Sequence, residues 1–233
     1  MRAILTLGTN FLRTQWLVAT LMAAYLVGIS GVFGFQGKRQ DVIFYLQWHS
    51  LYVIALGTMV AVPAIQAERK SRRILAVLSK GIHRWQYLAG LLTGCAMMSA
   101  LMCVIVGSVT YTLCQAGGYS AEGLLVLMAA LLACCICASA LGLCFSVFLH
   151  PLLATVATST VLLAPLLAER VGGHLPEALF PVVGVADVFA RFEFHAPANS
   201  IWGLAASALI QAVVFLAAGA VIFARRDVTI SPE

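Results

Sequence analysis

Residues 67–87 read AERKSRRILAVLSKGIHRWQY and lie between two long apolar runs. The chain has 14 Lys and Arg, and this stretch alone holds Arg69, Lys70, Arg72, Arg73, Lys80 and Arg84. Basic connections between apolar segments are typical of the cytoplasmic loops of membrane proteins, because Lys and Arg are retained on that side of the bilayer. The stretch therefore predicts both a membrane fold and its orientation.

The composition supports an integral membrane protein. The chain is 62% hydrophobic and 10% charged, whereas an ordinary soluble domain is about 25% charged. Its mean hydropathy is +0.98. The apolar runs are continuous rather than alternating, which favours helices over a barrel. The net charge of +5 is explained by the basic loops, so we expect no nucleic-acid partner.

Six segments are long and apolar enough, or nearly so, to cross a bilayer core of about 30 Å as helices. We therefore predict an all-α, polytopic membrane protein with one transmembrane domain over residues 1–233. The predicted spans are residues 15–35, 48–66, 88–113, 123–149, 151–168 and 201–224.

The fourth and fifth segments meet at His150-Pro151. Proline disfavours helix at the residue before it, which favours a tight turn between two spans. The alternative is one kinked helix, but that helix would be far longer than a single crossing needs.

Charge predicts the orientation of the six spans. With the N-terminus in the cytoplasm, the inside segments hold ten Lys and Arg against three acids, and the outside segments hold four against six. This asymmetry predicts that both termini are cytoplasmic. The expected location is the cell (inner) membrane.

Two further segments have a choice of interpretations. Residues 1–14 carry apolar residues with Arg2 and Arg13 near the ends, so they predict either a short interfacial helix or a frayed extension of the first span. Residues 169–200 form the longest external segment. Their middle, 178–190, is too apolar for a solvated loop and too short to span, which predicts either a membrane-dipping helical element or a small external cap.

The predicted spans have almost no ionisable residue in their apolar cores. Such residues commonly mark proton or ion relays, so a secondary transporter or an intramembrane enzyme is disfavoured. A transported substrate would meet hydroxyl, aromatic and amide groups instead. Small residues and hydroxyls on spans are more often packing contacts than ligands. The candidates for a substrate path are Tyr25, Thr58, Ser99, Ser139, Ser159 and Gln211.

The seven cysteines allow a metal interpretation, since Cys134, Cys137 and Cys144 lie close together on the fourth span. Thiolates suit Cu(I). However, Cys also behaves as a small buried apolar residue, and we expect packing rather than a metal site.

Residues 67–87, which we name the coupling segment, combine charge with an apolar stripe. Ile74, Val77 and Leu78 lie at helical spacing, and Ser79-Lys80-Gly81 is a predicted break. One interpretation is a basic loop that contacts anionic membrane lipid. The stripe favours a second: an ordered helix on the cytoplasmic face that a soluble partner binds.

The coupling segment resembles that of the type-2 ABC transporter permeases. Members often read glutamate-arginine-x-x-glycine-threonine-leucine-x-x-leucine-leucine-serine, then proline, then arginine before the next span. Arg72 and Arg73 stand where glycine and threonine are common, and Gly81 replaces the usual proline. The chain is also similar to the family in six spans, cytoplasmic termini and its ending Phe223-Ala224-Arg225-Arg226-Asp227. The residues in register are Glu68, Arg69, Ile74, Val77, Leu78, Ser79 and Arg84, followed by Gly90 and Leu92.

The resemblance implies the membrane half of an ATP-driven exporter for a lipid-like, amphipathic or drug-like substrate. A separate cytosolic ABC ATPase subunit would carry ATP and Mg, and a second permease subunit would complete the pathway. The chain has no ATPase motif of its own, so it would not itself be an enzyme. Alternatives are a haem-export-type permease and a non-transporting assembly or sensor subunit. The implied ATPase-coupling residues are Glu68, Arg69, Arg72, Arg73, Ile74, Leu78, Ser79, Gly81 and Arg84.

Overall fold

The protein is described by a computed structural model that covers residues 2–32, 38–70, 83–170, 180–191 and 198–225. Over these residues it is all-helical, with no strand, which confirms the all-α part of the prediction. The helices are α1 (Arg2–Thr14), α2 (Trp16–Val32), α3 (Arg39–Lys70), α5 (Arg84–Gly117), α6 (Leu124–Phe148), α7 (Pro151–Arg170), α8 (Pro181–Arg191) and α9 (Ala198–Arg225).

Four of these helices, α3, α5, α6 and α9, are long and apolar enough to cross a membrane. Helices α1 and α2 are bent by 64° relative to each other and add a fifth candidate if the pair forms one span. Helix α7 is apolar over Pro151–Pro165, the part whose side chains the structure describes, and this part alone is shorter than a span. The described chain thus fits a multi-pass membrane protein with four to five candidate spans, and the count of six stays a prediction.

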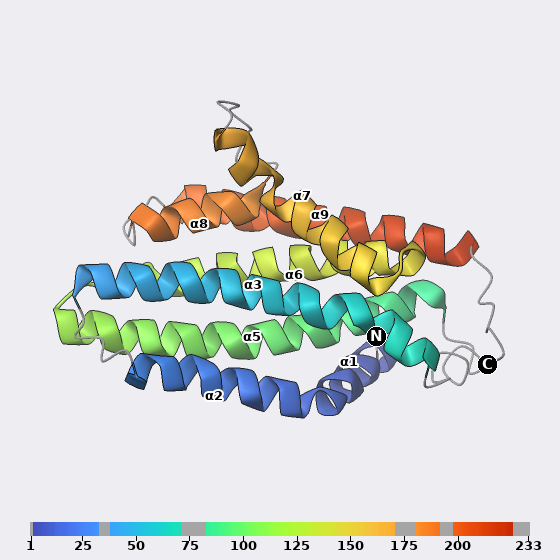
Figure 1. Ribbon diagram of the computed structural model, residues 1–233, viewed down its shortest axis with the longest axis horizontal. Helices are drawn as coiled ribbons and strands as arrows, with labels where there is room; N and C mark the ends of the chain where they lie inside the picture. The colour runs from blue at the N-terminus through green and yellow to red at the C-terminus, as the bar shows by residue number, and fades with distance from the viewer. Residues whose placement is uncertain (1, 33–37, 71–82, 171–179, 192–197, 226–233) are drawn as a thin grey trace.

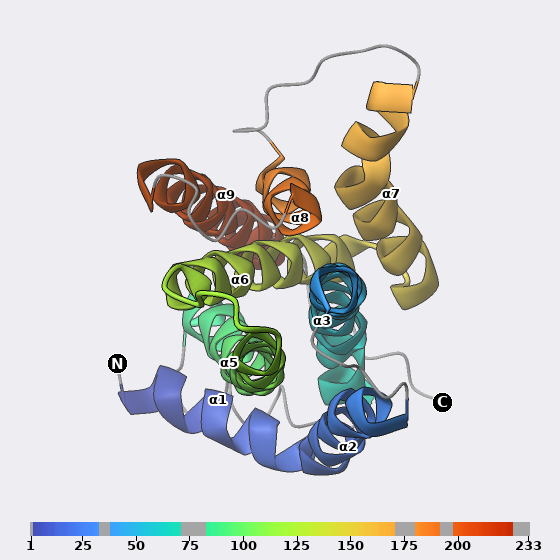
Figure 2. The ribbon, with the colours of Figure 1, turned by 90° about the vertical axis from the view of Figure 1, so that its left-hand side faces the viewer.

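Helix α6 lies at the centre of the bundle. Seen end-on, α3, α5, α1 and α2 lie on one side of it, and α8 and α9 lie on the other (Figure 2). It is the most buried of the four long helices. Its small residues permit this position: a Cβ on Gly142 would lie 3.1 Å from Val62 of α3, and one on Gly219 of α9 would lie 3.3 Å from Cα of Cys144.

Local capping sets the ends of two long helices. Helix α3 begins nine residues before the predicted span, where the carboxylate of Asp41 accepts a hydrogen bond from the Lys38 amide at 3.2 Å. Helix α5 begins where the Gln86 side chain accepts a hydrogen bond from the His83 amide at 3.2 Å. It ends at Gly118, whose φ of 71° is left-handed and suits a glycine C-cap.

The predicted turn at His150-Pro151 is confirmed. Leu149 has an extended backbone, with φ of −104° and ψ of 156°, and α7 begins at Pro151. Proline at the first helical position needs no intrahelical donor. The fourth and fifth apolar segments are therefore two helices and not one kinked helix.

Helix α8 occupies the apolar middle of the predicted external segment. It runs alongside the long helices (Figure 1) and buries Val183, Val185 and Phe189 against them. A Cβ on Gly184 would lie 2.7 Å from Leu204 of α9, so these two helices are in close contact. The helix is ordered and packed, and its depth in a membrane stays a prediction.

Candidate functional site

One end of the bundle brings together the helices that flank the coupling segment. Helix α3 finishes there, α5 begins there, and the C-terminal end of α9 lies beside them (Figure 1). We name this part, made of Glu68, His83–Tyr87 and Phe223–Arg225, the α3–α5 end.

Arg84 joins the start of α5 to the finish of α9. Its Nη1 donates hydrogen bonds to the carbonyl oxygens of Phe223, at 2.7 Å, and Ala224, at 3.3 Å. Its guanidinium carbon also lies 5.6 Å from the centre of the Phe223 ring. The last carbonyls of a helix lack intrahelical partners and carry partial negative charge, so an arginine there is stabilising.

A second contact lies one turn further along α5. Tyr87 and Phe223 are both fully buried, and their ring centroids are 6.4 Å apart. Buried aromatic pairs at this distance contribute beyond the apolar area that they bury. The first turn of α5 is therefore attached to α9 by both polar and apolar contacts.

Helix α1 packs closely against the N-terminal part of α5, and glycines on both helices allow the close approach. A Cβ on Gly90 would lie 2.7 Å from Cβ of Leu7, and one on Gly94 would lie 2.6 Å from the Phe11 ring. Gly8 of α1 faces Gly94 equally closely, since a Cβ on Gly8 would lie 3.1 Å from the Gly94 amide nitrogen. Small residues four apart allow such close helix contacts in membranes.

Only the two edges of the predicted coupling set are described. Glu68 is half-buried near the end of α3, Arg69 lies on its last turn, and Arg84 begins α5. Arg72, Arg73, Ile74, Leu78, Ser79 and Gly81 lie outside the described residues. The sequence predicts a role for Arg84 but not its partners, because no local signal in Phe223-Ala224 indicates a contact with α5.

Two of the predicted substrate-path residues meet at a helix junction. A Cβ on Gly57 of α3 would lie 3.0 Å from Oγ of Ser139 on α6 and 3.6 Å from Oγ of Ser99 on α5. Both serines are fully buried. The neighbouring Thr58 donates its hydroxyl to the Ala55 carbonyl of its own helix at 2.7 Å. The two serines thus lie where α3, α5 and α6 pack closely, and Thr58 is bonded within α3.

The other candidates lie apart from this junction. Tyr25 is exposed on α2, and its ring centroid is 4.8 Å from that of Tyr52 on α3. Ser159 is half-buried on α7. The structure does not bring the predicted path residues together as one site.

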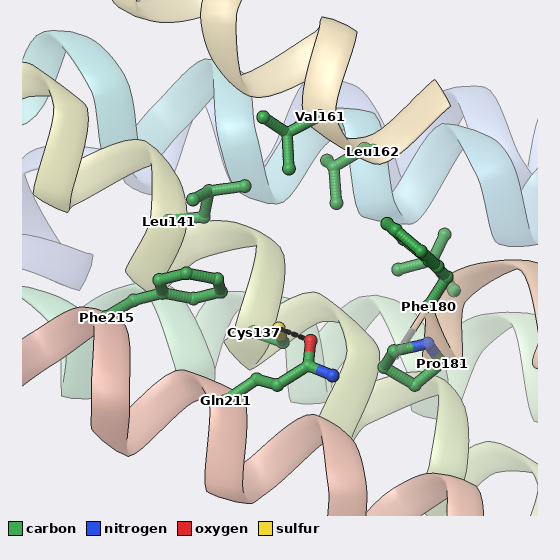
Figure 3. Close-up of a pocket in the computed structure, with 9 residues that line it drawn as sticks. Cys137, Leu141, Val161, Leu162, Phe180, Pro181, Gln211 and Phe215 are labelled. Carbon is green, nitrogen blue, oxygen red and sulfur yellow. Dashed lines mark hydrogen bonds between the residues drawn. The ribbon is translucent and has the colours of Figure 1, made fainter. Parts of the chain in front are cut away.

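Gln211 lies in an apolar cavity of about 310 Å³ between α6, α7, α8 and α9 (Figure 3). Its amide oxygen accepts a weak hydrogen bond from the Cys137 thiol at 3.7 Å. This volume is at the low end for small-molecule sites, which are mostly apolar with a few polar groups. The lining residues are Cys137, Leu141, Val161, Leu162, Phe180, Pro181, Val182, Gln211 and Phe215.

The cysteines are free and buried at all seven positions. Within the described ranges, no three His, Cys, Asp or Glu side chains lie together as a metal site. Cys137 has an identified contact in the Gln211 cavity, and Cys144 packs against Gly219.

Comparison with known proteins finds no family model and no curated protein that matches the chain. The resemblance to type-2 ABC permeases therefore rests on the residues quoted above.

Proposed function

We propose that this chain is the permease subunit of an ATP-driven ABC exporter, with six spans, both termini in the cytoplasm and the coupling segment bound by a separate ATPase subunit. Two such permease subunits would form a pathway for a lipid-like, amphipathic or drug-like substrate. The basic coupling segment and its resemblance to the family support the partner. The apolar helices support the membrane location.

The Arg84 contact is the observation that carries the proposal. The coupling segment connects α3 to α5, and the first turns of α5 are attached to α9 by Arg84 and Tyr87 and to α1 by Gly90 and Gly94. A displacement of the segment would therefore be passed to three helices together.

In the proposed mechanism, ATP binding closes the two ATPase subunits and moves the coupling segments. Each segment then shifts its permease from an inward-open toward an outward-open arrangement. The ATPase subunits act as a ligand that binds one of these two states better than the other. The energy of ATP binding thus acts on the spans through the α3–α5 end.

The proposal is tested by cross-linking in the native membrane. The variants Ser79→Cys and Ser120→Cys place the same new thiol in the coupling segment and in the α5–α6 turn. With a heterobifunctional thiol-and-photoactivated reagent, we expect Ser79→Cys to capture a subunit with a P-loop ATPase motif and Ser120→Cys to capture none.

The captured subunit must also hydrolyse ATP in the purified complex, and Arg84→Ala must change that rate. Failure of both thiols to capture an ATPase contradicts the proposal. The result would then favour the alternative function, a membrane subunit that does not transport. Capture with equal efficiency by both thiols means that contact is non-specific and contradicts it too.

A further inference from the structure

A second cavity, which we name the α5–α6 groove, lies between the C-terminal half of α5 and the N-terminal half of α6. Its volume is about 780 Å³, well within the range of small-molecule sites. Gly107 helps to open it: a Cβ there would lie 3.1 Å from the Met128 side chain across the groove. Leu125 and Val104, which line it, are strongly exposed, so the groove opens away from the bundle.

The lining changes from polar to apolar along the helices. Ser108, Tyr111, Thr112 and Glu122 gather near the α5–α6 turn, whereas Ala100 and Leu132 lie at the other end. At 1.5 Å per residue, the stretch of α5 from Ala100 to Thr112 is roughly 18 Å long. A groove of this length accommodates one extended alkyl chain of about a dozen carbon atoms.

The polar end favours a ligand that donates hydrogen bonds. The Ser108 hydroxyl donates to the Val104 carbonyl at 2.7 Å, and the Thr112 hydroxyl donates to the Val109 carbonyl at 2.7 Å. Their protons are therefore engaged, and their oxygens remain as acceptors. The Glu122 carboxylate is an acceptor that also carries negative charge.

The charges favour a cation and disfavour an anion. The described residues that line the groove include Glu122 and no Lys, Arg or His. A phosphate or carboxylate head group would meet no compensating charge there, and repulsion from Glu122. A cation would be attracted by Glu122 and by the face of the Tyr111 ring, which is half exposed.

We propose that the α5–α6 groove binds a cationic amphiphile, a protonated amine on a single apolar chain, with the amine at Glu122 and the chain between α5 and α6. The other occupants are a diacyl phospholipid and a second copy of this chain, and neither matches the acidic, acceptor-rich end as well. This site does not depend on the transport proposal, since binding is measured on the isolated chain.

The test uses the full chain in phosphatidylcholine nanodiscs with radiolabelled dodecylamine as the probe. We expect saturable binding that falls at least tenfold in Glu122→Gln, which keeps the shape of the side chain and removes its charge. Asp187→Asn removes the same charge on α8, which does not line the groove, and is expected to bind as the unchanged protein does. Ala129→Phe, which fills the groove, is expected to abolish binding without lowering thermal stability.

Competition and cross-linking test the other occupants. Dodecyltrimethylammonium, which has no N–H donor, is expected to compete several-fold more weakly than dodecylamine, and dodecanoate is expected not to compete. The proposal is overturned if Glu122→Gln binds as well as the unchanged protein, or if dodecanoate or phosphatidylethanolamine displaces the probe as well as unlabelled amine. It is equally overturned if Leu125→Cys forms disulfide-linked dimers in the membrane that no longer bind the amine, because a second copy then covers the groove.

Discussion

Arg84 connects two helices whose contacting residues are 139 positions apart in the chain. Its side chain combines two hydrogen bonds to carbonyls with a contact to the Phe223 ring. A lysine ammonium could also donate to these carbonyls, but it lacks the planar guanidinium that lies near the Phe223 ring. Arg84 is half-buried, so water weakens these bonds, and we place their joint effect at about 1–2 kcal/mol.

The variant Arg84→Ala is accordingly expected to lower the free energy of unfolding by about 1–2 kcal/mol, with Arg84→Lys intermediate. The measurement is thermal unfolding of the purified protein in mild detergent. Arg13→Ala is the control, because Arg13 is exposed and its loss removes the same charge. Equal effects of Arg84→Ala and Arg13→Ala would mean that the contact with α9 contributes nothing.

The glycines of α5 give a second prediction about single residues. Gly94→Ala would place a Cβ 2.6 Å from the Phe11 ring, and such overpacking typically costs about 1–3 kcal/mol. Gly28→Ala on α2 meets nothing within 4 Å and is expected to be neutral or stabilising by up to about 1 kcal/mol. The same unfolding measurement checks both. A neutral Gly94→Ala would contradict the close α1–α5 contact.

For single residues, the sequence predicted which positions matter better than it predicted the residues that they contact. Arg84 and Gly90 were singled out because they resemble a family pattern, and both lie at tight helix contacts. Their partners Phe223 and Leu7 could not be predicted, because nothing in a local pattern says which distant helix lies alongside. Ser99 and Ser139, candidates for a path, meet at Gly57. Small residues serve close packing as readily as binding, so their role in a path stays a prediction.

Among the helices, α5 is contacted near its start by both α1 and α9. Helix α1 packs on it through Gly8 and Phe11, and α9 packs on it through Phe223. Helix α1 is therefore not a straight continuation of α2, because the two are bent by 64° relative to each other. It packs against the bundle along α5. Its location at the membrane interface remains a prediction.

Two variants on α1 test whether it is docked. Phe11 is buried and Leu5 is about half exposed. Phe11→Ala leaves a cavity against Gly94 and is expected to cost about 3 kcal/mol, whereas Leu5→Ala is expected to cost less than about 0.5 kcal/mol. The readout is the unfolding temperature together with protease cleavage between α1 and α2. Similar losses for both variants would indicate a helix that lies free of α5.

Hydropathy predicted where most helices lie but not where they end. The predicted span 48–66 lies inside α3, which extends back to Arg39 through a polar first turn, residues 39–41, and the apolar stretch 42–46. The extension is stabilised by the Asp41 cap and by burial of Val42, Tyr45 and Leu46 in the core. The charged residues Arg39 and Asp41 lower an apolar count taken over it. The turn at Pro151 was predictable because proline acts on the local backbone alone.

For the whole molecule, the orientation is the next property to test. The predicted topology places Ser79 inside the cell and Ser120 outside. A membrane-impermeant maleimide is therefore expected to label Ser120→Cys in intact cells and to label Ser79→Cys only after the membrane is opened. The native cysteines are buried and give a low background. Labelling of Ser79→Cys in intact cells would show that the orientation is opposite to the predicted one.

The number of spans was the least predictable property of the whole. Six apolar segments were predicted, and four helices meet the length and composition of a span, or five with the bent pair. Composition alone cannot distinguish a helix that crosses the bilayer from an apolar helix packed against others. Helix α8, with 11 residues, is too short to span. Helix α7 has 20 residues, and its number of crossings stays a prediction.

The central place of α6 also bears on how the protein is made. Its neighbours α3 and α5 leave the ribosome before it, whereas α9 begins 50 residues after the end of α6. Until then, the face of α6 around Cys144, which later receives Gly219, is not yet covered by α9. Small residues bury little surface against lipid and gain stability mainly from close contact with another helix. Nascent chains stopped before α9 would therefore remain incompletely assembled and be exposed to membrane proteases, so the last helix acts as the completion step of biogenesis.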